Sequence, residues 1–152
     1  MGYGIEVVEL KPQPVLVMEA VAAPPELGDV LAGILPMVHA FAESHGASIT
    51  GMPFLRYLAM TDRFTIEAGM PVAETIDSEG EVQCRELPGG RAATTVFLGP
   101  YDRVGDAWDA LYGWCDERGI ERRFGGWDVY ENDPTGIDDP KDYRTRLYLP
   151  LP

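Results

Sequence analysis

The chain carries one sequence pattern twice, at a nearly constant offset. Glu9-Leu10 precedes a proline-rich break and an apolar run over residues 15–21, and Glu86-Leu87, 77 positions further on, precedes a second apolar run over 92–98. A glycine–aspartate pair at the start of two helical patterns keeps the same offset: Gly28-Asp29 and Gly105-Asp106. A fixed-offset echo is typical of one supersecondary unit used twice. We therefore expect two similar halves, with a pocket at the seam between them.

The length of the chain fits one domain rather than two. Each unit of roughly 75 residues would be marginal alone, because a small domain buries too little of its surface. We expect a single domain over residues 1–152, with one repeat at about 1–75 and the second at about 79–152. The polar segment 73–80 is then a hinge between repeats.

Periodicity and breaker residues predict the order strand, helix, strand, strand in each half. The predicted strands cover residues 5–10, 15–21, 49–59, 64–72, 82–87, 91–98, 125–131 and 143–149. The predicted helices run from Pro24-Pro25 to Gly46 and from about 101 to 118. The fold class expected is α+β, with an antiparallel sheet, both helices on one face and a ligand groove on the other.

The charge of the chain excludes several classes of partner. It has 12 basic and 25 acidic residues and a net charge of −13. This field repels phosphate backbones and anionic lipid, so we expect no nucleic acid and no membrane partner. Neither a signal peptide nor a long apolar span is present, which favours a cytoplasmic protein.

Residues that hold metals or perform familiar catalysis are sparse. Cys84 and Cys115 form no zinc pattern; we expect reduced, buried thiols, with a disulfide as the alternative. His39 and His45 are expected in solvent, and the acidic loop over 132–142 lacks the spacing of a calcium loop. The sequence therefore predicts no metal and no cofactor, and it contains no nucleophile elbow, zincin or phosphate-loop motif.

Strand alternation selects a candidate ligand surface. Because side chains alternate between the two faces of a strand, Trp127 and Val129 are assigned to the helix side. The opposite face is then expected to carry seven ligand-binding candidates: Leu55, Tyr57, Glu67, Asp128, Tyr130, Arg146 and Tyr148. Aromatic walls with a few placed charges are typical of ligand sites. The alternative is that these are ordinary sheet residues, with Glu67 and Arg146 as a solvated cross-strand pair.

The order of several short motifs resembles the GyrI-like small-molecule-binding domain. The likeness rests on Leu87-Pro-Gly-Gly-Arg-Ala-Ala, Gly99-Pro-Tyr, Trp127-Asp-Val-Tyr, Asp133-Pro134 and the final run from Tyr143 to Leu151. The resemblance implies two βαββ modules around a groove that binds amphipathic, often cationic compounds. It also implies a stand-alone member, because the chain leaves no room for a helix-turn-helix.

One position departs from the family pattern. Members often carry a glutamate after the threonine of the last strand, where this chain has Arg146. Asp128 and Glu67 then supply the negative charge, or Arg146 neutralises Glu67, or the ligand is not a cation. The sequence leaves these alternatives open.

Three functions are compatible with these residues. The first is a binding protein that sequesters amphipathic, cationic or toxic small molecules. The second, implied by the resemblance, is a hydrolase of cyclopropane-bearing toxins, with Glu67 as general base and Tyr130 or Tyr148 donating to the leaving oxygen. The third is an acidic protein that binds a protein partner, as gyrase-protecting relatives do, or a second copy of itself.

Overall fold

The computed structural model describes residues 3–121, 125–132 and 136–152. The first half comprises β1 (Glu6–Leu10), β2 (Gln13–Ala22), α1 (Leu27–Ser44), β3 (Phe54–Met60) and β4 (Phe64–Pro71). The second half comprises β5 (Gln83–Leu87), β6 (Gly90–Leu98), α2 (Val104–Glu117), β7 (Trp127–Tyr130) and β8 (Arg144–Pro150). Short 3-10 turns, η1 (Pro24–Glu26) and η2 (Tyr101–Arg103), lead into the two helices, and η4 (Pro140–Asp142) precedes β8. The predicted α+β class is confirmed.

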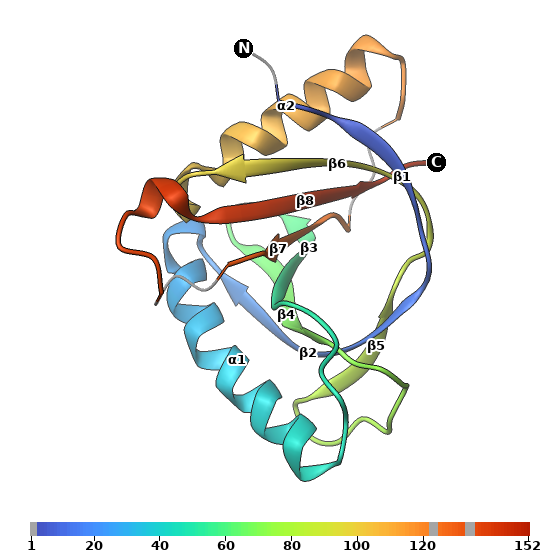
Figure 1. Cartoon of the computed structure of the whole chain (residues 1–152), viewed down its shortest axis with the longest axis vertical. Helices are drawn as coiled ribbons and strands as arrows, with labels where there is room; N and C mark the ends of the chain where they lie inside the picture. The colour runs from blue at the N-terminus through green and yellow to red at the C-terminus, as the bar shows by residue number, and fades with distance from the viewer. Residues whose placement is uncertain (1–2, 122–124, 133–135) are drawn as a thin grey trace.

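The described strands form one eight-stranded antiparallel sheet in the order β1-β6-β8-β7-β3-β4-β2-β5. The order is symmetric: each strand of the first half and its counterpart in the second half lie equally far from opposite ends of the sheet. The counterparts are β1 and β5, β2 and β6, β3 and β7, and β4 and β8. β7 and β3 pair at the centre, so the seam between the halves runs down the middle of the sheet. Figure 1 shows the sheet curling, with α1 and α2 lying against it on either side of this seam.

The first strand of each half crosses to the other half. β1 pairs with β6, and β5 pairs with β2. The proline-rich break predicted between the two N-terminal strands is the crossover that makes this exchange possible, because proline cannot continue a ladder. The two crossovers touch each other: a Cβ placed on Gly89 would lie 2.6 Å from Cδ of Pro12.

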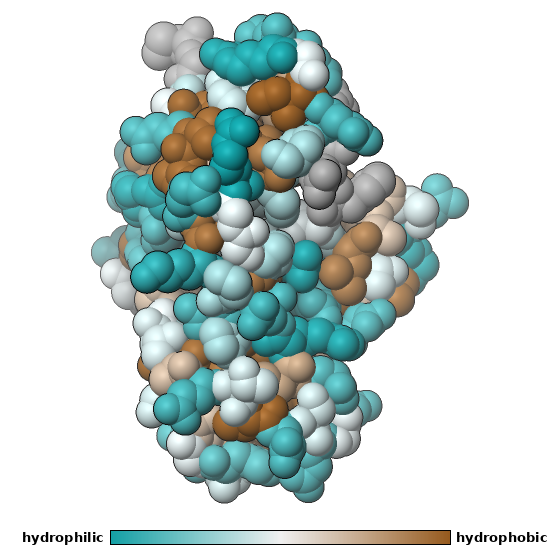
Figure 2. Space-filling model, turned by 90° about the vertical axis from the view of Figure 1, so that its right-hand side faces the viewer, coloured by the Kyte–Doolittle hydropathy of each residue, from teal (hydrophilic) through white to brown (hydrophobic). Residues whose placement is uncertain are grey.

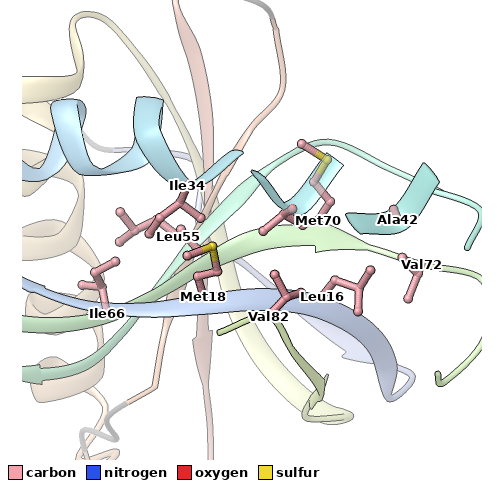
Figure 3. Packing of buried hydrophobic residues seen from close by; sticks show 11 residues of the cluster. Leu16, Met18, Ile34, Ala42, Leu55, Ile66, Met70, Val72 and Val82 are labelled. Carbon is pink, nitrogen blue, oxygen red and sulfur yellow. The ribbon is translucent and has the colours of Figure 1, made fainter. Parts of the chain in front are cut away.

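Each helix closes one half of the core on the same face of the sheet. Ile34, Val38 and Ala42 of α1 pack on strands of the first half, in one buried cluster with Leu16, Ile66 and Met70. Figure 3 shows part of this packing. Trp108, Leu111 and Cys115 of α2 pack in the same way on the second half. Tyr57 contacts both clusters, which places it at the seam.

The face of the sheet away from the helices has an apolar cluster of its own. Val15, Val17, Phe54, Leu87 and Trp127 are buried there, with Val129 and Tyr148 packed against them. The assignment of Trp127 and Val129 to the helix side is therefore wrong. The curl of the sheet lets both faces bury apolar side chains, so a bulky residue does not identify the helix side.

The remaining differences from the predicted elements are small. The third predicted strand begins at Phe54 rather than at Ile49, which forms only an isolated bridge with Val72.

The side of the molecule on the right in Figure 1 is mostly hydrophilic, with separate hydrophobic patches (Figure 2). Cys84 and Cys115 are free, the first half-buried and the second buried, so the disulfide alternative does not apply.

Candidate functional site

A large cavity lies on the helix face, where the turns before the two helices approach the central strands. Its volume is about 580 Å³. Its aromatic walls come from both halves: Tyr57, Phe64, Tyr101, Trp108 and Tyr112. Asp102 and Asp109, both exposed, lie at its edge and add negative charge. The cavity is thus a cross-half site with aromatic walls and an acidic rim.

Two smaller cavities continue this space along the seam. One of about 270 Å³ is lined by Leu55, Asp128 and Tyr130, and another of about 350 Å³ extends to Leu35 and Asn132. Tyr101 lines all three cavities. We call the three together the helix-side groove. Asp128 lies in its middle compartment.

Strand register brings the groove residues together from the two halves. Leu55 of β3 is the direct cross-strand partner of Asp128 in β7. Tyr57 and Tyr130 each follow two positions later, so alternation turns all four side chains toward the helices. The side chains of these four residues, which the sequence placed on one face, therefore lie together in the groove.

Asp128 is the buried charge of the groove. Only 2% of the residue is exposed. The hydroxyl of Tyr57 donates to Oδ2 at 2.5 Å, and the indole N–H of Trp108 donates to Oδ1 at 2.7 Å. No residue that the structure describes forms an ion pair with it. Burial raises the pKa of this carboxyl to about 7, although both hydrogen bonds lower it.

Tyrosines around Asp128 remain protonated donors. Burial is the main cause that raises the pKa of Tyr57 and of Tyr130 well above the usual range, and the negative charge of Asp128 adds to it. Tyr101 lies edge-on to Tyr130 at 5.2 Å and stacks on Tyr143 at 4.9 Å. Tyr57 meets Trp108 edge-on at 5.9 Å. The groove thus combines one buried carboxylate with several aromatic rings, whose faces attract cations.

The other three predicted ligand residues lie on the opposite face. Glu67, 5% exposed, accepts a hydrogen bond from Nε of Arg85 at 2.9 Å. Arg146 donates to Glu131 at 3.1 Å rather than pairing with Glu67, and Tyr148 stacks on Trp127 at 5.5 Å. The expectation that all seven residues share one face is therefore wrong.

Two consequences follow for the predicted groove. The sequence placed the groove opposite the helices, whereas the helix-side groove shares their face; a smaller cavity of about 330 Å³ lies on the opposite face. Glu67 and Tyr130 also lie on opposite faces, so the predicted catalytic pair cannot contact one substrate. The cause is the double-sided packing of the central strands, which reverses the predicted orientation of β3 and β7.

Some groove residues were not predicted from the sequence. The sequence patterns did not select Trp108, although a buried indole N–H generally requires an acceptor and so indicates a polar partner. Tyr101 was noted only as part of the Gly-Pro-Tyr motif, and Phe64 only as a strand residue. Tyr101 and Phe64 have one feature in common. Each is the first residue of an element at the seam, η2 for Tyr101 and β4 for Phe64.

The two histidines, His39 and His45, do not line the helix-side groove. His45 stacks on Phe41 at 3.9 Å and bonds Glu79 at 2.8 Å, while His39 is exposed. Within the described ranges, no group of three or more His, Cys, Asp or Glu could hold a metal ion. Neither α1 nor α2, as described, is long and apolar enough to cross a membrane. Asp133 and Pro134, quoted for the family motif, lie outside the described residues.

Comparison with protein families gives one match, and it covers almost the whole chain. The model of the GyrI-like small molecule binding domain matches residues 4–152. A search of curated proteins finds no match.

Solved structures share this architecture at low sequence identity. The C-terminal domain of EcmrR superposes with a TM-score of 0.87 at 18% identity, covering 100% of this chain and 99% of that one. A hydrolase encoded by lin2189 from Listeria innocua gives 0.67 at 10% identity, covering 99% and 93%. SAV2435 bound to tetraphenylphosphonium gives 0.64 at 10% identity, covering 100% and 94%. At these identities the likeness establishes the fold.

Proposed function

Because the chain belongs to the GyrI-like small-molecule-binding family, we propose that it sequesters amphipathic aromatic cations in the helix-side groove, with Asp128 as their counter-ion. The observation that carries this proposal is a buried carboxylate that, among the described residues, accepts hydrogen bonds from two neutral donors and forms no ion pair. Such a group is costly to ionise in isolation, and a cation entering the groove removes that cost.

The walls of the groove fit the apolar part of such a ligand. Aromatic rings from both halves surround the carboxylate, and each face that meets a cation adds about 0.5–2 kcal/mol. The volume of the largest compartment, about 580 Å³, lies within the usual range for small-molecule sites. The exposed rim carboxylates, Asp102 and Asp109, favour the approach of positive charge. The net charge of −13 acts in the same direction.

The ligand class is also supported by a relative of the same fold. SAV2435 was solved with tetraphenylphosphonium, a bulky aromatic monocation. This compound is therefore the first probe to use. Triphenylphosphine oxide is a neutral comparison compound, since it keeps three of the four phenyl rings on phosphorus and lacks the positive charge.

A charge-matched titration tests the proposal. Tetraphenylphosphonium should bind the wild-type protein, and Asp128→Asn should weaken it about 100-fold, since removing one partner of a buried charge pair costs 2–5 kcal/mol. Triphenylphosphine oxide should bind both proteins alike. Glu67→Gln, which removes a buried carboxylate on the opposite face, is the matched control and should not change either affinity. Equal binding of tetraphenylphosphonium by wild type and Asp128→Asn refutes the counter-ion role.

A hydrolase is the second candidate, and one observation favours it. A carboxyl group with a pKa of about 7 beside tyrosine hydroxyls can transfer protons near neutral pH. Opening a cyclopropane fused to a dienone adds water across the strained bond: hydroxide joins carbon and a proton reaches the carbonyl oxygen. Asp128 would take the proton from water and Tyr130 would donate to the oxygen, in place of the separated pair Glu67 and Tyr130.

Turnover separates catalysis from binding. If the groove is catalytic, a cyclopropane-bearing substrate disappears faster with wild type, and Asp128→Asn abolishes the reaction while Glu67→Gln keeps it. Release of unchanged substrate from the wild-type protein after long incubation leaves sequestration as the function.

A further inference from the structure

We propose a second ligand site on the opposite face of the sheet, which takes a planar aromatic anion. The site is the cavity of about 330 Å³ where the two crossovers pass over the seam. Leu10 and Lys11 line it from the first crossover, and Leu87 and Pro88 line it from the second. The central strands β3 and β7 form its base through Phe54 and Trp127. Both halves thus contribute to this cavity, as they do to the helix-side groove.

The walls of the cavity suit a flat ring system. Trp127 and Tyr148 stack with their ring centroids 5.5 Å apart and their planes 27° apart. Phe54 and Trp127 are buried, whereas Tyr148 is half-buried and borders the cavity from β8. Aromatic pairs gain most when another ring can lie offset against them, so a planar ligand would extend this stack.

The charged residue that lines this cavity is basic. Lys11 is the single charged residue among the described residues that line it, and it is exposed. It forms no ion pair with the part of the chain that the structure describes. Elsewhere on this face of the sheet, Arg85 pairs with Glu67 and Arg146 pairs with Glu131. An unmatched ammonium beside an aromatic wall selects an aromatic carboxylate or a similar planar anion.

The contrast with the helix-side groove defines the chemistry of each site. Charged residues that line the groove are acidic, whereas the one charged residue that lines this cavity is basic. Trp127 and Asp128 are consecutive in β7 and point to opposite faces, so the two sites lie back to back across the sheet. A cation and an anion could therefore be bound at the same time.

A pair of probes with one ring system and opposite charge tests this site. We expect 2-naphthoate to bind the wild-type protein and to quench tryptophan fluorescence. Lys11→Gln should weaken it about fivefold, the scale of an exposed charge contact, and Lys11→Glu more strongly. Lys11 is exposed, so both variants should fold. 2-Naphthylmethylammonium, with the same rings, should instead prefer the helix-side groove and lose affinity in Asp128→Asn.

The location of binding decides the outcome. With the groove saturated by tetraphenylphosphonium, 2-naphthoate should still bind, and its amide chemical-shift changes should fall in residues 10–13, 87–89 and 127–129. Failure of 2-naphthoate to saturate, or its displacement by tetraphenylphosphonium, overturns the second site but leaves the cation site intact. Equal affinity for wild type and both Lys11 variants overturns the assigned role of the ammonium. Loss of tetraphenylphosphonium binding in Asp128→Asn with retained 2-naphthoate binding supports both sites.

Discussion

Two buried carboxylates, one on each face of the sheet, are held in different ways. Glu67 is 5% exposed and accepts from the guanidinium of Arg85, whereas Asp128 is 2% exposed and, among the described residues, accepts from a phenol and an indole. The first charge is neutralised by the protein itself. The second is stabilised by these hydrogen bonds and has no cation partner in the part of the chain that the structure describes, so its neutralisation is left to a proton or to a ligand.

This difference supports Asp128, rather than Glu67, as the carboxylate of the proposed ligand site. An ion pair within the protein leaves little net charge for an incoming group, and a partly exposed pair contributes modestly to stability. A buried carboxylate without a cation costs several kcal/mol when it ionises. Proteins keep such groups chiefly at functional sites, which is consistent with the position of Asp128 in the groove.

The largest expected effect is on stability, and it arises from Asp128 alone. Its pKa is about 7 in the folded protein and 3.8 is the ordinary value. Between these values the folded carboxyl keeps a proton that the unfolded chain has lost, so the free energy of unfolding falls as pH rises. The fall is about 1.4 kcal/mol per pH unit, roughly 4 kcal/mol in total, and it ends above pH 7.

Urea unfolding of wild type and Asp128→Asn from pH 4 to 8 measures this fall. The difference between the two free energies of unfolding isolates the effect of Asp128 from that of other titrating groups. As pH rises, the free energy of unfolding of the wild type should fall relative to that of Asp128→Asn. Parallel pH profiles for the two proteins would contradict a raised pKa for Asp128. Glu67→Gln should not reproduce the effect.

The second effect is on binding, with the opposite sign. A cation needs the carboxylate form, so the affinity for tetraphenylphosphonium should rise with pH up to about 7 and then level off. Below that value the rise approaches tenfold per pH unit, the limit for one proton. Calorimetry in buffers of different ionisation enthalpy should show proton release at pH 6. Affinity independent of pH between 5 and 8 would show that Asp128 is not the counter-ion.

A smaller effect follows from loss of one donor to Asp128. Tyr57→Phe removes a hydrogen bond to a charged group, worth about 1.5–3 kcal/mol when Asp128 is ionised. The pH at which cation binding is half-maximal should move upward by about one unit. Tyr148→Phe, which changes a tyrosine on the opposite face, should leave that midpoint unchanged. An unchanged midpoint in Tyr57→Phe would show that the hydrogen bond from Tyr57 does not lower the pKa of Asp128.

The smallest effect should come from removing the cation beside Glu67. Because the Arg85 side chain is 48% exposed, water can replace the guanidinium in Arg85→Met, so Glu67 does not become a fully enclosed carboxylate like Asp128 and the loss should be about 1 kcal/mol. Thermal unfolding at pH 7.5 measures it. Binding of tetraphenylphosphonium should be unaffected, and a clear loss of that binding would show that the two faces are coupled.

The fold could be predicted from the sequence because its signals are local. Prolines, glycines and apolar periodicity located the helices and strands to within a few residues, except where the third predicted strand was extended to Ile49. In β4 and β8 one set of alternate residues is clearly apolar, as with Ile66 and Leu147, so the orientation of Glu67 and Arg146 was predicted correctly. These strands have an unambiguous pattern.

The site could be predicted only in part, because the central strands carry large apolar or aromatic residues at both alternations. Phe54 and Leu55 are both buried, and Trp127 and Asp128 are both buried. Alternation showed that Leu55, Tyr57, Asp128 and Tyr130 belong together but not which face they occupy. That choice depends on the curl of the sheet, a long-range property that local pattern does not contain. Trp108 reaches Asp128 from α2, which no strand pattern could indicate.

The exchange of β1 and β5 between the halves has a consequence for how such a chain could be divided. A polypeptide with one half alone would have its first strand lacking the β6-type neighbour with which it pairs here. In the intact chain, each half therefore supplies an outer strand to the part of the sheet formed by the other half. Cleavage in residues 73–80 should accordingly yield fragments that stay interlocked and reassociate after denaturation.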